Sequence, residues 1–157
     1  MKKTFKNILS VGMSLIMAIS TMAITTLADE EVLYGLSTSP PVYNYGEIST
    51  YDNNYPTDTW NLSTNGSYYV EGSANGSAYI YTLYNFTGVD SIAISLTNNS
   101  SSNLTVILYK NGILNTQKGS FTVSANSNGG KLFTELDENS KYYFAFSAPC
   151  DFQGYIA

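Results

Sequence analysis

Short runs of alternating apolar and polar residues, separated by turn-forming residues, fill the chain from residue 59 onward and most constrain its fold. In the clearest run, residues 91–97, Ile92, Ile94 and Leu96 alternate with serine, alanine and threonine. Because successive side chains of a strand point to opposite faces, this run predicts a strand with one buried face. Such runs recur at a spacing of roughly 8–12 residues, which is typical of a β-sandwich or barrel.

The alternating runs predict one all-β domain over residues 59–157. The candidate strands cover residues 59–63, 67–70, 78–86, 91–97, 104–109, 121–123, 132–136, 141–147 and 152–156. Asn-Gly pairs at 65–66 and 75–76 predict tight type I′ turns, and residues 126–130 and 137–140 predict a polar loop and a turn. We therefore expect a single jelly-roll-like β-sandwich of about eight or nine short antiparallel strands.

The N-terminal segment, residues 1–28, has the pattern of a secretory signal peptide. Lys2, Lys3 and Lys6 precede an uncharged run rich in Ile, Leu, Met and Ala that extends to Ala28. Cleavage is expected after Ala28, with Ala23 as an alternative. The run is long enough to remain as a membrane anchor, but Ser, Thr and Gly interrupt it, which favours cleavage and a secreted, extracellular protein.

A second segment, residues 29–58, has neither helical nor strand periodicity. It contains Pro40, Pro41 and Pro56 together with many Ser, Thr, Asn and Tyr residues. This composition predicts an irregular polar arm between the signal peptide and the sandwich, part of it packed on the domain.

Charge excludes two classes of partner. Residues 29–157 keep all twelve acidic residues of the chain but only four dispersed lysines, and the chain has no arginine. Phosphate contacts need clustered cations, so we expect no nucleic-acid binding. For the same reason, we expect no adsorption on anionic lipid once the signal peptide is removed.

Three later segments resemble a known bacterial family. They are Leu104-Thr-Val-Ile-Leu-Tyr-Lys110, Phe133-Thr-Glu-Leu136 and Lys141-Tyr-Tyr-Phe-Ala-Phe146. Together they resemble bacterial pre-peptidase C-terminal domains, over roughly residues 67–156. Asn85-Phe-Thr-Gly88, Ser147-Ala-Pro-Cys150 and Phe152-Gln-Gly154 are similar to small secreted Gram-positive proteins without an established function. The resemblance implies a β-sandwich with a non-catalytic, surface-binding role. Some domains of the family bind calcium or collagen, but their ligand positions have no match here.

Several kinds of chemistry are excluded by residue supply. The chain has no histidine, which removes Ser-His and Cys-His nucleophile pairs. With no histidine and one cysteine it cannot close a zinc site. Cys150 is expected to be a small buried residue rather than a reactive thiol, because no cation adjoins it in sequence. We therefore predict that the protein is not an enzyme and has no resident cofactor.

Carboxylates leave two alternatives open. Glu135, Asp137 and Glu138 are expected to form a solvated turn, whereas Glu71 and Asp90 could face each other as a glycosidase requires. Calcium remains open because hard cations take oxygen ligands. The candidate loop holds Asp52, Asn53, Asn54 and Asp58, but it lacks the EF-hand glycine and terminal glutamate, which favours a simple turn.

Aromatic residues suggest a binding surface for sugars, since 14% of the chain is Phe, Trp or Tyr. The candidate ligand-binding residues are Tyr43, Tyr45, Tyr51, Tyr55 and Trp60. The four tyrosines lie outside the alternating runs, whereas Trp60 alternates with Leu62 and could equally be a core residue.

We therefore expect a secreted, non-catalytic binding module for an extracellular or cell-surface glycan or protein. The first alternative is a structural surface protein that self-associates through tyrosines and strand edges. The second is a carboxylate-dependent glycosidase.

Overall fold

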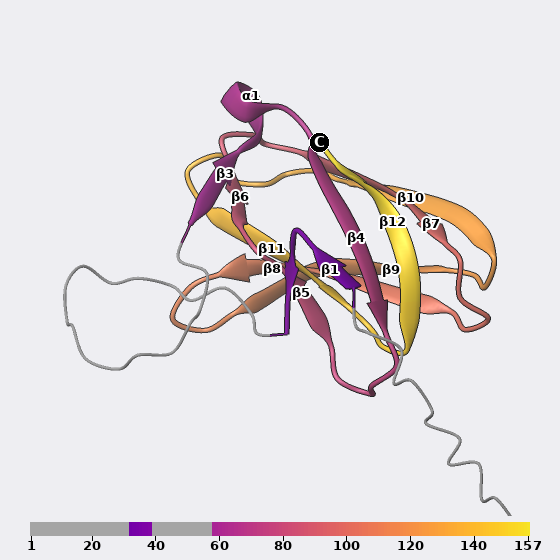
Figure 1. Ribbon diagram of the computed structural model, residues 1–157. Helices are drawn as coiled ribbons and strands as arrows, with labels where there is room; N and C mark the ends of the chain where they lie inside the picture. The colour runs from indigo at the N-terminus through magenta and orange to yellow at the C-terminus, as the bar shows by residue number, and fades with distance from the viewer. Residues whose placement is uncertain (1–31, 39–57) are drawn as a thin grey trace, which may run out of the picture.

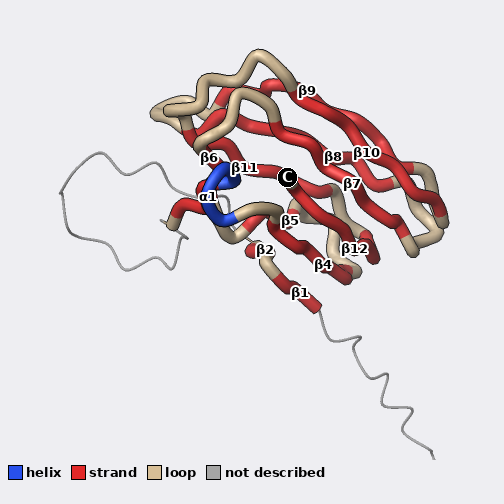
Figure 2. Tube along the Cα trace, turned by 90° about the horizontal axis from the view of Figure 1, so that it is seen from above, coloured by secondary structure: helices blue, strands red, loops and turns tan. Residues whose placement is uncertain are grey.

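The computed structural model describes residues 32–38 and 58–157, which form two β-sheets packed face to face (Figure 1). The first sheet has five strands, in the order β1 (Val32–Tyr34), β4 (Tyr68–Ala74), β12 (Cys150–Ile156), β7 (Ile92–Asn98) and β10 (Ser127–Phe133). Seen from above, these five strands lie side by side (Figure 2).

The second sheet has seven strands. Five follow the order β2 (Leu36–Ser37), β5 (Ile80–Thr82), β11 (Lys141–Phe146), β6 (Asn85–Thr87) and β3 (Thr59–Asn61). Strand β8 (Leu104–Asn111) also pairs with β11, and β9 (Thr116–Val123) pairs with β8. Every pair is antiparallel except the β3–β6 pair, which is parallel. The predicted all-β sandwich is confirmed, with twelve strands in the described residues rather than about eight or nine.

The core lies between the sheets and follows the predicted alternation. Ile92, Ile94 and Leu96 of β7 are buried, and the residues between them are exposed or half-buried. Phe146 of β11 stacks on Phe152 of β12 with ring centroids 4.6 Å apart, which joins the two sheets. Burial of each such side chain contributes about 2–3 kcal/mol. Cys150 is buried among these residues, as predicted.

Residues 32–37 differ from the predicted irregular arm, because they form β1 and β2 in two different sheets. The chain passes between the sheets at Gly35, where φ is +69°. A Cβ atom there would lie 2.8 Å from the Tyr68 hydroxyl and from the Tyr69 carbonyl oxygen, so only glycine fits. The rest of the arm before Asp58, and the predicted signal peptide, lie outside the described residues.

The predicted type I′ turns are wrong. The strand expected at 59–63 ends at Asn61, whose side chain accepts hydrogen bonds from the backbone N–H groups of Ser63 (3.0 Å) and Thr64 (3.2 Å). This cap starts the single helical turn α1 (Leu62–Asn65). In the described residues, the only non-glycine positions with positive φ are Asn126 and Glu135, so neither Asn65 nor Asn75 has the type I′ conformation.

Strand β10 replaces most of the polar loop predicted at 126–130. Its residues pair with β7 over the whole strand, including Gly130 opposite Ser95. A Cβ atom at Gly130 would lie 2.6 Å from the Ile94 carbonyl oxygen, so this glycine allows close approach rather than a turn.

Within residues 32–38 and 58–157, no helix has the length and apolar character needed to cross a membrane.

Candidate functional site

The outer face of the five-stranded sheet carries a group of tyrosines beside polar side chains. Strand alternation sends Tyr68, Val70 and Gly72 of β4 toward the core, and Tyr69 and Glu71 toward the outside. We call this surface the tyrosine face; its residues are Tyr34 of β1, Tyr69 and Glu71 of β4, Gln153 and Tyr155 of β12, and Ser95 and Thr97 of β7.

Strand register arranges the tyrosine face in two rows across the sheet. Tyr69 is opposite Tyr155, which is opposite Ser95 on β7. In the neighbouring row, Tyr34 is opposite Glu71, and Gln153 lies between Glu71 and Thr97. Tyr34 belongs to the second row by register, but its ring contacts Tyr69, so the three tyrosine rings form an oblique line, the aromatic row, beside the carboxylate, amide and hydroxyl groups of Glu71, Gln153 and Thr97.

The three tyrosine rings contact one another in sequence. The centroid of the Tyr69 ring lies 5.7 Å from that of Tyr34 and 5.2 Å from that of Tyr155, and both pairs are tilted. Such pairs limit ring motion and fix the rings relative to the sheet. Tyr34 and Tyr155 nevertheless remain 62% and 57% exposed, so much of their apolar surface is open to a ligand.

The Tyr69 hydroxyl ties the aromatic row to the polar row. It donates a hydrogen bond to Glu71 Oε2 at 3.0 Å and has Gln153 Oε1 within 3.2 Å. Partial desolvation of the hydroxyl raises the pKa of Tyr69, and the hydrogen bond to the Glu71 carboxylate raises it further. Tyr69 therefore stays neutral near pH 7 and remains a hydrogen-bond donor.

Two pockets meet at Tyr69. The first, the edge pocket, has a volume of about 350 Å³ and lies between Tyr34, Trp60, Tyr69, Leu83 and Tyr84. The second, the face pocket, has a volume of about 450 Å³ and is bounded by Tyr69, Thr97, Gln153 and Tyr155. The Tyr69 ring therefore borders one pocket on the tyrosine face and another at the sheet edge, which extends to Trp60, Leu83 and Tyr84.

Trp60 is the only one of the five predicted ligand-binding residues in the described part of the chain, and it lines the edge pocket. Its indole N–H donates to the Gly66 carbonyl oxygen at 2.9 Å. Its ring packs edge-on against Tyr68 and Tyr84, at centroid distances of 5.1 and 5.9 Å. Trp60 is thus half-buried and internally bonded, and it forms a wall rather than an open platform. The other predicted residues, Tyr43, Tyr45, Tyr51 and Tyr55, lie outside the described residues.

Sequence reasoning missed Tyr34, Tyr69 and Tyr155. The signal available was that Tyr68 and Tyr69 are adjacent, so one of the two must face outward on a strand. Periodicity alone does not say which of them does, because the same run is compatible with either register.

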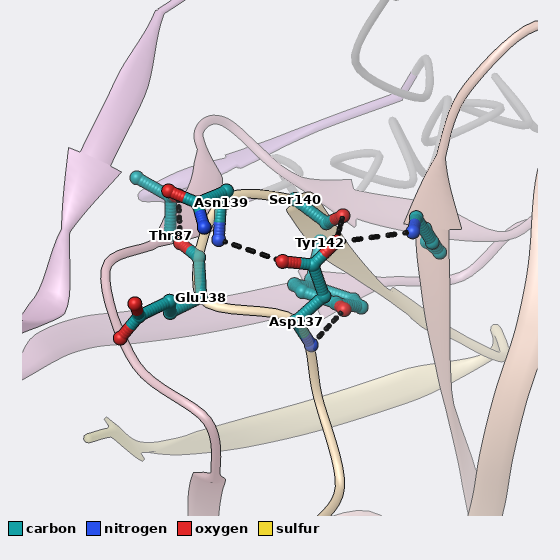
Figure 3. A network of polar contacts seen from close by, with 7 residues as sticks. Thr87, Asp137, Glu138, Asn139, Ser140 and Tyr142 are labelled. Atoms are coloured by element: carbon teal, nitrogen blue, oxygen red, sulfur yellow. Dashed lines mark hydrogen bonds and ion pairs between the residues drawn. The ribbon is translucent and has the colours of Figure 1, made fainter.

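The acidic residues after β10 form a turn, as predicted (Figure 3). The Asp137 carboxylate accepts hydrogen bonds from the Ser140 hydroxyl at 2.7 Å and the Asn139 backbone N–H at 3.1 Å. These bonds, together with Lys110 Nζ at 3.7 Å, lower the pKa of Asp137.

The same turn is anchored on both sides. The Asp137 backbone N–H donates to the Tyr142 hydroxyl at 2.8 Å, and the Thr87 hydroxyl donates to the Glu138 carbonyl oxygen at 3.0 Å (Figure 3). The polar groups of this turn therefore hold β6 and β11 together.

Glu71 and Asp90 do not meet. Gln153 of β12 pairs with both Glu71 of β4 and Thr97 of β7, so Glu71 and Thr97 lie at the same height in the sheet. Asp90 lies before the start of β7. At roughly 3.3 Å per residue, the two acids are about 20 Å apart along the strand direction. Glycosidase carboxyl pairs are separated by about 5–10 Å, so this pair does not fit.

The described residues contain no group of three or more Asp, Glu or Cys side chains able to hold a metal ion. Of the candidate calcium loop, Asp52, Asn53 and Asn54 lie outside these residues. Asp58 is exposed, and its carbonyl oxygen accepts a hydrogen bond from the Asn85 N–H at 3.1 Å.

Comparison with known proteins does not assign the chain to a family. No family model matches the sequence, and no curated protein matches it. A solved structure described as "CBM4 structure and function" is similar at 16% identity and a TM-score of 0.34, covering 58% of this chain and 67% of that one. Similarity this low identifies neither a ligand nor a site. The resemblance to pre-peptidase C-terminal domains stays a prediction.

Proposed function

We propose that the protein is a secreted, non-catalytic module that binds a polysaccharide on the tyrosine face. The observation that carries this proposal is the row of contacting Tyr34, Tyr69 and Tyr155 rings, open on the outer face of a sheet. Polar groups of Glu71, Gln153 and Thr97 lie in the adjacent row.

The chemistry of this surface suits sugars. The C–H faces of a sugar ring are apolar and cover an aromatic ring, while its hydroxyls need donors and acceptors at the side. Covering about 200 Å² of apolar surface contributes about 5 kcal/mol, from which the cost of immobilising the sugar is subtracted. We expect weak binding of short oligosaccharides and stronger retention by polymers, along which the site can rebind.

Catalysis is not part of the proposal. The chain lacks histidine, and Glu71, the acidic residue of the two polar-aromatic rows, has its oxygen Oε2 bonded to the Tyr69 hydroxyl.

Self-association is the alternative role for the same surface. Leu132 of β10 is exposed on the same side of the sheet, since it pairs with the outward-facing Ala93. A second copy that covered both Leu132 and the tyrosines would bury an apolar area typical of a weak dimer. Light scattering during size-exclusion chromatography at high concentration separates the two roles, because a binding module remains a monomer.

Affinity electrophoresis through gels that contain β-glucan, mannan, xylan, glycol chitin or solubilised peptidoglycan tests the proposal. We expect at least one polysaccharide to retard the protein and Tyr69→Ala to abolish the retardation. Tyr79→Ala is the matched control, because Tyr79 is exposed just before β5 and lies outside the tyrosine face. Unretarded migration of the wild type in every gel, or equal retardation of Tyr69→Ala, contradicts the proposal.

A further inference from the structure

The Tyr69 ring lines both pockets. Tyr69 lines both the edge pocket and the face pocket, whose volumes are about 350 and 450 Å³. Its two neighbours in the aromatic row each belong to one pocket, Tyr34 to the edge pocket and Tyr155 to the face pocket. The two pockets therefore adjoin at Tyr69, and the edge pocket continues around the edge of the sheet to Trp60, Leu83 and Tyr84.

The spacing of the row suits a chain of rings rather than one. The steps from Tyr34 to Tyr69 and from Tyr69 to Tyr155 are 5.7 and 5.2 Å, each comparable with the length of one sugar unit. A ligand that follows the row crosses the strands obliquely, from β1 over β4 and β12 toward β7.

No described side chain closes the row at Tyr155, whereas the edge pocket beside Tyr34 is walled by Trp60, Leu83 and Tyr84. Tyr34 lies on β1, the edge strand of the sheet. At the other end, Tyr155 is followed by Ser95 and then by Gly130, which has no side chain to form a wall. On the described residues, a polymer can therefore extend past Tyr155, so the site does not require a free chain end there.

The charges around the row favour an uncharged ligand. Glu71 lies beside the aromatic row, and no lysine of the described residues shares this face. Lys131 Nζ donates a hydrogen bond to the Ser120 carbonyl oxygen at 2.9 Å. The remaining lysines, Lys110, Lys118 and Lys141, belong to strands of the other sheet. A carboxylated or phosphorylated polymer would thus meet a carboxylate and no cation.

We infer that the edge pocket and the face pocket are two adjoining subsites for neighbouring units within an uncharged polysaccharide chain, with Tyr69 contacting both units. This inference rests on the proposed function and adds to it the number of subsites, the direction of the ligand and its charge class.

Oligosaccharides of one to six units, prepared from a polysaccharide that retards the protein, test the two subsites by isothermal titration calorimetry. We expect affinity to rise at least tenfold from one unit to about three or four, when both pockets are filled, and then to level off. Reducing the terminal sugar of the longest oligosaccharide to its alditol should leave affinity unchanged. Equal affinity for one unit and for six, or loss of binding on reduction, overturns the inference.

Two matched blocking variants test whether the rise in affinity with oligosaccharide length comes from the two pockets. Ser67→Trp fills the edge pocket and Ser95→Trp fills the face pocket, and both serines are exposed, so neither change disturbs the core. Each variant should bind the longest oligosaccharide only as tightly as the wild type binds one or two units. A full length-dependent gain in either variant overturns the inference, while failure of the wild type to bind any polysaccharide overturns the proposed function itself.

The charge class is tested with one neutral polymer that binds and its carboxymethylated derivative. We expect the derivative to bind at least tenfold more weakly at low ionic strength, and the difference to shrink as salt is added. Equal or tighter binding of the carboxymethylated polymer overturns the assignment of an uncharged ligand.

Discussion

Asn98 shows how a single buried polar residue organises one end of the sandwich. Its amide nitrogen lies 2.8–3.2 Å from the carbonyl oxygens of Ser102, Val123 and Ser124, and its Oδ1 accepts from the backbone N–H and hydroxyl of Ser100. The residue is fully buried at the end of β7. It therefore connects the loop after β7 to the turn after β9, which belong to different sheets.

We expect Asn98→Ala to destabilise the protein by about 3 kcal/mol, because the substitution leaves buried carbonyl groups without a donor. For a domain of this size, the melting temperature should fall by roughly 10–20 °C. Thermal unfolding followed by circular dichroism measures this. Asn99→Ala is the control, since Asn99 is exposed and its backbone N–H, which donates to the Asp151 carbonyl oxygen, is retained in the variant. Equal melting temperatures for the two variants would show that Asn98 has no such role.

Tyr143 is only 3% exposed although it points to the outer side of the seven-stranded sheet. Its ring stacks on Tyr109 at 5.3 Å and contacts Tyr81 at 6.2 Å. Burial, followed by the proximity of the Tyr109 and Tyr81 hydroxyls, raises the pKa of Tyr143 from the ordinary tyrosine value of 10.0 to about 12. The unfolded chain thus releases this proton at lower pH than the folded protein does.

The stability that depends on neutral Tyr143 is fully present below pH 10 and is lost as the pH rises toward 12. We expect Tyr143→Phe to flatten the decline of the urea midpoint between pH 9 and pH 11.5, relative to wild type. Tyr79→Phe, at an exposed tyrosine, should decline as the wild type does. Parallel pH profiles for wild type and Tyr143→Phe would refute the account of Tyr143.

Elements with strict alternation could be predicted from the sequence, and elements defined by close approach could not. Strand β7 was predicted because its apolar residues alternate without interruption. Most of strand β10 was missed because Gly129 and Gly130 resemble a loop in composition, although they pair with β7; only Leu132 and Phe133 fall in the strand predicted at 132–136. Helical turn α1 was missed because its start depends on the Asn61 side chain, which a turn and a cap use equally well.

Strand β12 offers a test at the scale of one element. It pairs with both β4 and β7, and Gly154 lies at the middle of this contact. A Cβ atom at Gly154 would collide with the Ser95 carbonyl oxygen and lie 2.8 Å from Leu96 Cδ2. Because backbone atoms cannot yield as a side chain does, Gly154→Ala should destabilise the fold by about 3 kcal/mol.

Urea unfolding measures the effect of Gly154→Ala, and Gly76→Ala is the matched control. A Cβ atom at Gly76 would meet nothing closer than the Ala78 nitrogen at 4.0 Å, so that variant should unfold as the wild type does. Similar unfolding of both variants would mean that the sheet adjusts at Gly154 and that its close packing is not required.

At the scale of the whole molecule, the sequence predicts two packed sheets but not the order of the strands within them. The alternating runs establish that each strand has a buried face, and two packed sheets are the common solution to that requirement. Strand order depends on pairings between distant segments, such as β12 beside β4 and β1 beside β4. No local pattern reports these pairings.

The tyrosine face could not be predicted for the same reason. Its residues come from β1, β4, β7 and β12, which extend over almost the whole described chain. Local reasoning selected Tyr43, Tyr45, Tyr51 and Tyr55 because they lie outside the alternation, whereas Tyr69 and Tyr155 lie within it, on the outward positions. A strand residue becomes part of a surface site only when sheet pairing brings its neighbours alongside.

The central claim is that a polysaccharide binds on the outer face of the five-stranded sheet. Two-dimensional ¹H–¹⁵N NMR of the protein tests it most directly, during titration with an oligosaccharide prepared from a polysaccharide that retards the protein in a gel. The account predicts shifts concentrated in β1, β4 and β12 and at Ser95 and Thr97, and unchanged resonances in β8 and β9. Shifts confined to the seven-stranded sheet, or absent at saturating oligosaccharide, would contradict it.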